Sequence, residues 1–168
     1  RRGIGAVGVF TEPDASDGPA VWVLISHPSL ASLSAVNASI NADAAVLAAG
    51  ADYLSGPTKA NPAFDRIDSW LLLAFAGMPK LELPSFSKNR TPTRVFEMRD
   101  YESHSELKAL NKMAMFDDGE IAVMKDLGMS PVFFGQALTG PNLPHLRYFT
   151  SGSDLATHLA NWKKLGPA

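Results

Sequence analysis

The stretch TRVFEMRDYESHSE, residues 93–106, decides the fold of this chain. Its first nine residues are rich in branched and aromatic side chains, which predicts a β-strand. Ser103 and Glu106 then match a capping box, in which the two side chains satisfy orphan amide groups at a helix start. We expect this helix to reach about Leu127, with a bend or break at residues 117–119 where Asp-Asp-Gly interrupts the apolar stripe.

After this helix, the sequence predicts a hairpin and a further helix. The two strands are PVFFGQALTG (131–140) and PHLRYFTSG (144–152), separated by turn residues. Ser153 or Asp154 then caps a final helix that reaches Lys164. The order strand, helix, strand, strand, helix is that of a β-α-β-β-α-β ferredoxin-like unit without its closing strand.

The first half of the chain is also an incomplete copy of the ferredoxin-like unit, but it lacks different elements. Strand-like runs at 5–12 and 20–26 predict an antiparallel hairpin closed by Pro, Asp, Ser and Gly. Residues 29–50 favour one helix or two shorter ones. The apolar run DRIDSWLLLAFAG (65–77) is consistent with a buried strand that closes this half, which lacks its opening strand and helix.

These elements predict an α+β chain with a ferredoxin-like tandem repeat. We expect a first module at 1–79, an exposed linker at 80–92 and a second module at 93–168. The incomplete copies, and a chain that opens with Arg1, indicate truncation at both ends. An unpaired sheet edge promotes strand pairing between chains, so we expect a partner subunit to cover it and the chain to be a homodimer.

Composition narrows the function classes. The 168 residues are 46% hydrophobic and carry a formal net charge of -2, so no basic field favours nucleic acid as a partner. The absence of cysteine excludes disulfides, thiol nucleophiles and Cys-ligated metals. No stretch is apolar enough for a membrane span and no targeting segment is visible, so we expect a soluble protein whose localisation stays open.

Three segments carry a resemblance to a known family. RVFEMRDY (94–101), KMAMFDDGEIAV (112–123) and GMSPVFFGQALTGPNLPHLRYF (128–149) resemble the second module of NIPSNAP-family proteins, and the likeness covers roughly residues 93–165. The first half is similar to the back part of a first NIPSNAP module. The resemblance implies a dimeric α+β barrel, in which two ferredoxin-like sheets close face to face. It implies no particular reaction, because the family has no agreed one.

The strand at 93–101 supplies the first candidate site residues. Side chains alternate along a strand, so Glu97, Arg99 and Tyr101 share one face while Phe96 and Met98 share the other. If the apolar pair packs under the helices, the polar trio points into the barrel, where Arg99 could bind an anionic ligand. The alternatives are an internal Glu97–Arg99 ion pair, a set of residues at the dimer contact, or an enzyme with Glu97 as base and Tyr101 as acid.

The second hairpin adds Phe134, Gln136, His145 and Tyr148 as residues that could line the same pocket. Among the four histidines, His145 lies nearest a plausible cavity and would be the first choice for a haem or a metal. It shows no ligand spacing with the others, so we predict no metal site and no cofactor. A lone histidine of this kind is more often structural.

Two further patterns carry no function. Residues 3–8 fit G-x-G-x-x-G, but strand and turn residues follow where a dinucleotide fingerprint needs a helix. Asp117, Asp118 and Glu120 form one short cluster, whereas a calcium loop spreads its oxygen ligands over about twelve residues.

The sequence therefore predicts a small-molecule-binding or protein-interaction module. The rival hypothesis is an enzyme of the kind that such barrels host, for example a cofactor-free monooxygenase or a haem-handling protein, and it rests on fold analogy alone.

Overall fold

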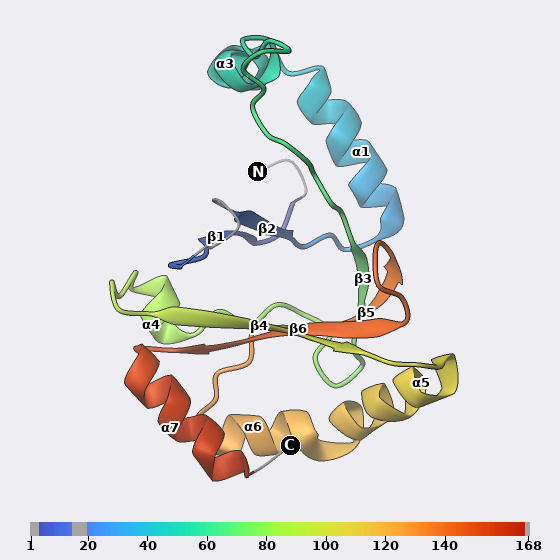
Figure 1. The fold of residues 1–168 in the computed structure, drawn as a ribbon, viewed down its shortest axis with the longest axis vertical. Helices are drawn as coiled ribbons and strands as arrows, with labels where there is room; N and C mark the ends of the chain where they lie inside the picture. The colour runs from blue at the N-terminus through green and yellow to red at the C-terminus, as the bar shows by residue number, and fades with distance from the viewer. Residues whose placement is uncertain (1–3, 15–19, 167–168) are drawn as a thin grey trace. The chain divides into compact units, whose positions relative to one another are not determined.

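The computed structural model describes residues 4–14 and 20–166, which belong to two compact units, Arg1–Ile67 and Asp68–Ala168 (Figure 1). Each unit contains one antiparallel sheet together with helices. The predicted α+β class is therefore confirmed. No described helix has the length and apolar character that crossing a bilayer requires.

The first unit begins with the predicted hairpin. β1 (Val7–Thr11) pairs antiparallel with β2 (Val21–Ile25), and Val9 lies opposite Val23. The glycine-rich motif at 3–8 thus leads into a strand, although Gly3 and the turn residues 15–19 lie outside the described residues. One face of this ribbon is apolar and 45% to 65% exposed; its side chains are Val7, Val9, Val21, Val23 and Ile25.

Three short helices follow the ribbon. α1 (Leu30–Asn41) starts at a capping box formed by Ser29 and Ser32, and α2 (Ala44–Ala49) is capped by Asp43. α3 (Ala51–Leu54) completes the set. Of the two alternatives for residues 29–50, one helix or two shorter ones, the structure shows two, and only Val36 among their apolar residues is buried.

The second unit is built on a four-stranded antiparallel sheet. Its strands are β3 (Leu71–Ala74), β4 (Val95–Glu102), β5 (Phe133–Thr139) and β6 (His145–Gly152), in the spatial order β3-β5-β6-β4. The predicted hairpin is β5-β6, in which Phe134 lies opposite Tyr148. β4 therefore forms one edge of the described sheet and β3 the other.

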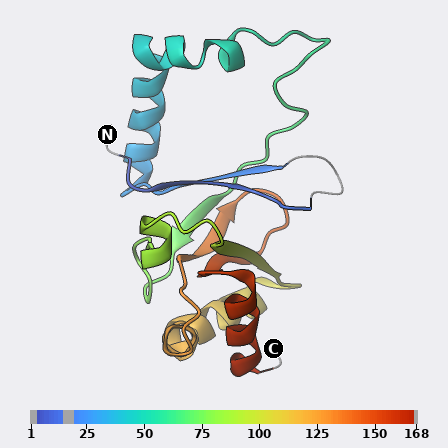
Figure 2. The ribbon, with the colours of Figure 1, turned by 90° about the vertical axis from the view of Figure 1, so that its left-hand side faces the viewer.

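Helices cover one face of this sheet (Figures 1 and 2). They are α5 (Glu106–Met115), α6 (Ile121–Asp126) and α7 (Leu155–Leu165), while the single-turn α4 (Ser85–Lys88) lies in the expected linker. Between sheet and helices lies the core. Its fully buried side chains include Phe116, Met124, Met129, Phe134 and Tyr148.

The predicted break in the long helix is present as a π-helical turn, Phe116–Glu120, between α5 and α6. Asp117, which begins the Asp-Asp-Gly sequence, accepts a hydrogen bond at Oδ1 from the Gly77 N–H at 2.8 Å. The turn is thus held to the loop that follows β3. The acidic residues here act in local structure, and no group of three or more His, Cys, Asp or Glu in the described ranges could hold a metal ion.

The strand expected over 65–77 differs from the prediction in length and partner. We expected a buried strand that closes the first half, but β3 has four residues and pairs with β5 of the second unit. β3 lies at the edge of the sheet, and its Leu73, opposite Gln136, is 56% exposed. A continuous apolar run predicts a strand, but it does not say which sheet the strand joins.

Candidate functional site

The condition under which Glu97, Arg99 and Tyr101 would point into a barrel, with Phe96 and Met98 packed under the helices, is not met. Glu97 bonds to side chains of α7, and the ring of Tyr101 lies 5.9 Å from that of Phe116. Glu97, Arg99 and Tyr101 therefore all face the helix layer. Polar side chains are tolerated there because α7 supplies N–H donors to the carboxylate.

Three donors converge on the Glu97 carboxylate. Oε1 accepts from Arg99 Nε at 2.7 Å, and Oε2 accepts from His158 Nε2 at 2.6 Å and Trp162 Nε1 at 2.5 Å. His158 and Trp162 lie four residues apart on α7, so both reach the same point on β4. The bond to Glu97 requires a hydrogen on His158 Nε2, and His158 Nδ1 is buried without a hydrogen-bond partner.

This arrangement holds Glu97 in its charged form. Burial alone would raise its pKa, but the hydrogen bonds from His158 and Arg99 outweigh burial and lower the pKa from 4.5 to about 2. For Arg99, burial opposes the charge, yet the hydrogen bonds to Glu97 and Tyr101 raise its pKa above the ordinary value. A carboxylate with so low a pKa is a weak base, so the geometry argues against Glu97 as a general base near neutral pH.

The expected ion pair is therefore formed, and it occupies the wall of a groove. The guanidinium of Arg99 lies 3.8 Å from the centroid of the Trp162 ring, while the Arg99 side chain remains 35% exposed. The groove has a volume of about 310 Å³ and runs between β4 and α7. Its remaining lining is mostly apolar: Val95, Phe96, Leu155 and Leu159, with Glu97 and His158 at its polar part.

The aromatic candidates lie in the core. The rings of Phe134 and Tyr148 are stacked 4.7 Å apart, and neither residue is exposed. Burial raises the pKa of Tyr148, as does the hydrogen bond that its hydroxyl donates to Tyr101. Neither Phe134 nor Tyr148 lines the groove, and Gln136, which shares their face by strand alternation, is partly buried on β5.

His145 lies on the other face of the sheet, because it is three positions, an odd number, from Tyr148 along β6. Its Nδ1 is 2.9 Å from the carbonyl oxygen of Asn142, and its buried Nε2 has no hydrogen-bond partner. On the same face, Arg147 forms a bidentate ion pair with Asp100 at 2.6 Å. The structure thus does not bring His145 together with Glu97 and Arg99.

Two residues that complete the cluster, His158 and Trp162, were not among the predicted site residues. They lie 61 and 65 residues from Glu97 in the sequence. A signal was present, since a histidine and a tryptophan four residues apart on an amphipathic helix both carry N–H donors. Such a pair needs an acceptor on the facing strand, and Glu97 is the acidic residue of β4 on that face.

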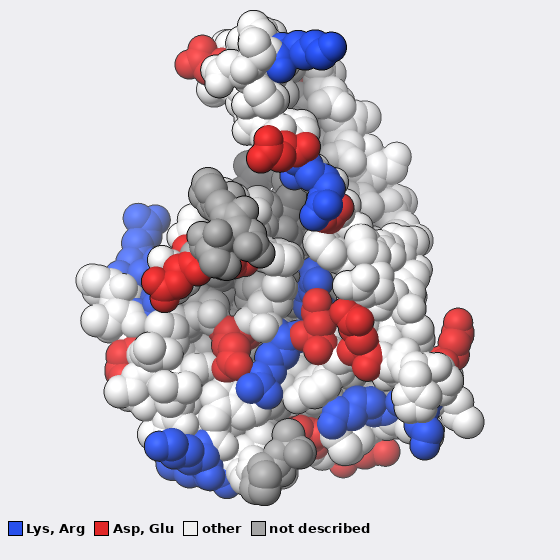
Figure 3. Space-filling view, viewed as in Figure 1, with Lys and Arg blue, Asp and Glu red and all other residues white. Residues whose placement is uncertain are grey.

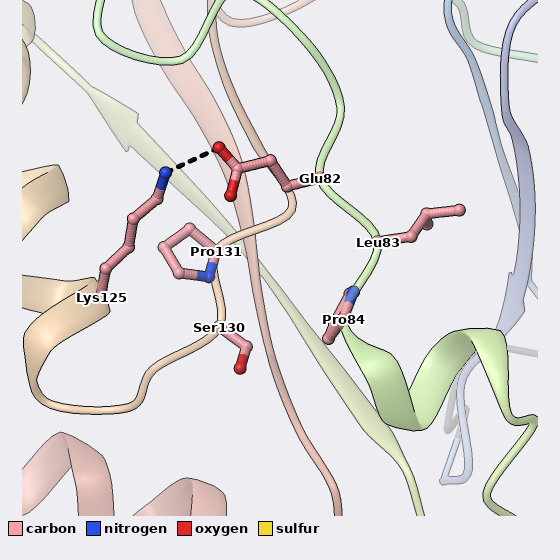
Figure 4. Close-up of a pocket in the computed structure, with 6 residues that line it drawn as sticks. All are labelled: Glu82, Leu83, Pro84, Lys125, Ser130 and Pro131. Atoms are coloured by element: carbon pink, nitrogen blue, oxygen red, sulfur yellow. Dashed lines mark hydrogen bonds and ion pairs between the residues drawn. The ribbon is translucent and has the colours of Figure 1, made fainter.

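A second, smaller pocket lies between the loop before α4 and the end of α6 (Figure 4). It measures about 220 Å³, and Glu82 and Lys125 form an ion pair of 2.7 Å across it. Both side chains are more than a third exposed, at 54% and 37%. Water screens charges that are this exposed, so the pair would attract a ligand only weakly. The β4–α7 groove is therefore the stronger candidate.

Charged side chains do not concentrate on the visible surface. On the face shown in Figure 3, the described Lys and Arg side chains are interspersed with Asp and Glu.

No protein-family model, no curated protein and no solved structure matches the chain.

Proposed function

We propose that this chain is a protein-interaction module that binds an extended polypeptide segment along the outer edge of β4. In this mode the bound segment adds a strand to the sheet, main-chain hydrogen bonds supply affinity, and alternate side chains enter pockets that supply specificity. The observation that carries the proposal is the position of the groove, which lies directly beside an edge strand of eight residues.

The main chain of β4 has donors and acceptors directed away from the sheet. Ser103 N donates to Pro144 O at 3.0 Å, at the position that continues the β4-β6 register. Hydrogen-bonded pairs alternate along an antiparallel ladder, so the odd-numbered residues of β4 bond to β6. Met98, Asp100 and Glu102 therefore direct their N–H and C=O groups outward, and no hydrogen bond to a described residue engages them.

The groove offers both apolar and charged contacts to the side chains of such a segment. Leu155 and Leu159 of α7 are 58% and 51% exposed although both line the groove. Covering an exposed leucine contributes about 1 to 2 kcal/mol of binding. Arg99 adds a cation whose position is fixed by Glu97 and Trp162.

We also propose that the chain is a NIPSNAP-like, ferredoxin-like tandem that forms a dimeric α+β barrel. Two observations support this. β4, α5-α6, β5, β6 and α7 follow in the order of the first five ferredoxin-like elements, with β6 between β4 and β5 in the sheet. β3, the strand expected from the first module, pairs with β5, and such an exchange between modules is what closing a barrel requires.

Selection of peptides tests the interaction proposal. A library of random nine-residue peptides displayed on phage is selected on the chain, and enriched peptides are measured by titration calorimetry. Leu159→Lys places a charge in the groove and should weaken these peptides about 10-fold or more, whereas the matched exposed leucine variant Leu107→Lys on α5 should not. Failure to enrich any peptide, or equal losses in both variants, contradicts the proposal.

A small anionic ligand is a second candidate function, favoured by the exposed part of Arg99 above Trp162. An anion with an apolar body would contact Arg99 with its charged end and the groove leucines with its chain. Octanoate is the probe and uncharged octanol its control. Octanoate should shift the indole N–H resonance of Trp162, and Arg99→Gln should abolish the shift; an equal response to octanol would refute a charged site.

A further inference from the structure

We infer that the segment bound at β4 is the β4 strand of a second copy of this chain, paired about a two-fold axis at Met98. This inference rests on the proposed function, because it names the partner for the same edge. It is argued from the order of charges along residues 94–102 and from the directions of the main-chain groups.

Symmetry restricts how two β4 strands can pair. In a continuous antiparallel sheet, residues directly opposite each other point to the same face. A two-fold axis must therefore pass through a residue position, where that residue faces its own copy. Centring the axis on Glu97, Arg99 or Asp100 would place like charges directly opposite each other, which is unfavourable.

Centring the axis on Met98 removes every like-charge contact and creates attractive ones. Glu97 then lies opposite Arg99 of the second copy on the helix face, and Arg94 lies opposite Glu102 of the second copy on the other face. Each pair occurs twice because of the symmetry. The remaining pairs are Met98 with Met98 and Val95 with Tyr101, which are largely apolar, and Phe96 with Asp100, whose carboxylate keeps its ion pair with Arg147 of its own chain.

The main chain supports the same register. Met98 directs its N–H and C=O groups outward, so the two copies of Met98 would exchange both hydrogen bonds at the axis. Glu102 has no hydrogen bond or ion pair within the described residues, and Arg94 donates only to the Thr91 carbonyl, at 2.7 Å. Both side chains can therefore pair across the axis without breaking an ion pair within their own chain.

Exchange of these two charges tests the register. Sedimentation velocity on the full chain should show a dimer, and Glu102→Lys should raise its dissociation constant about 30-fold, because two attractive pairs become repulsive. Arg94→Glu should act similarly. The double variant Arg94→Glu/Glu102→Lys restores opposite charges and should return the constant to within about 3-fold of the original. Asp118→Lys makes the same charge change outside β4 and should have no effect.

The outcomes separate this inference from the proposed function. A chain that is monomeric up to about 100 µM overturns the inference, while peptides enriched in the selection experiment would still support strand binding at β4. A dimer that is insensitive to both single variants, or that the double variant does not restore, places the interface elsewhere and also overturns it. Far-UV circular dichroism confirms that each variant is folded, and Glu102→Gln, which removes the attraction without repulsion, should give an intermediate effect.

Discussion

Replacing Glu97 with glutamine should remove a pH-dependent part of the stability of the second unit. The carboxylate accepts from Arg99, His158 and Trp162, and a glutamine side chain can present only one oxygen to these donors. Its amide nitrogen would face a donor and leave it unpaired. We expect Glu97→Gln to lower the free energy of unfolding by about 2 to 3 kcal/mol at pH 7.

The pKa of Glu97 gives an independent magnitude and a sign. A fall from 4.5 to about 2 corresponds to about 3 kcal/mol, reduced to about 2 kcal/mol because 31% of the side chain is exposed to screening water. The folded-state pKa lies below the unfolded one. This stabilisation is therefore fully present above about pH 5 and is lost as the pH falls through 2.

Urea unfolding followed by far-UV circular dichroism at pH 7, 5, 3 and 2 measures both quantities. The difference between wild type and Glu97→Gln should shrink toward zero at pH 2, because a protonated glutamic acid resembles glutamine. Asp118→Asn is the matched control, since Asp118 lies outside β4, is exposed and makes no hydrogen bond or ion pair with a described residue. A cost for Glu97→Gln below about 0.5 kcal/mol, or one that is equal at pH 7 and pH 2, would refute the reasoning.

Two further substitutions test how the second unit is held together. Gly152→Ala should destabilise it by about 2 kcal/mol in the same urea assay, because the new methyl carbon would lie 2.7 Å from His158 Cβ and 3.1 Å from the Asp154 carbonyl oxygen; a neutral result would show that α7 can move away from β6. Asp117→Ala should cost about 1 kcal/mol by removing the acceptor of the Gly77 N–H, whereas Asp118→Ala should be neutral; equal effects would mean that the bond to Gly77 contributes nothing.

Local patterns in the sequence predicted the elements well. The strand at 93–101, the helix after it, its interruption at residues 117–119 and the second hairpin all occur close to where they were expected. The helix cap differs, because Ser105, and not the predicted Ser103, accepts the hydrogen bond from the Lys108 N–H at the helix start. Each of these depends on neighbouring residues, through capping, side-chain periodicity or turn chemistry. The secondary structure of such segments is therefore determined by residues within about ten positions along the sequence.

Pairings between distant segments were not predictable in the same way. Alternation along β4 separates Glu97 and Arg99 from Met98, but it does not say which set faces the helices. That choice depends on α7, whose His158 lies 61 residues away and supplies the donor that makes a buried carboxylate tolerable. The partner of β3 is a choice of the same kind, because an apolar run suits an edge of either sheet.

The valine and isoleucine face of the β1-β2 ribbon has a consequence for handling the protein. These side chains are half or more exposed on average, and water next to such a surface is displaced whenever another apolar surface approaches. Sulfate and similar salts strengthen this effect because they are excluded from protein surfaces. We therefore expect the ribbon to promote precipitation by such salts, and replacing Val9 and Val23 with threonine should raise the salt concentration at which the protein precipitates while keeping the branched side chains that strands favour.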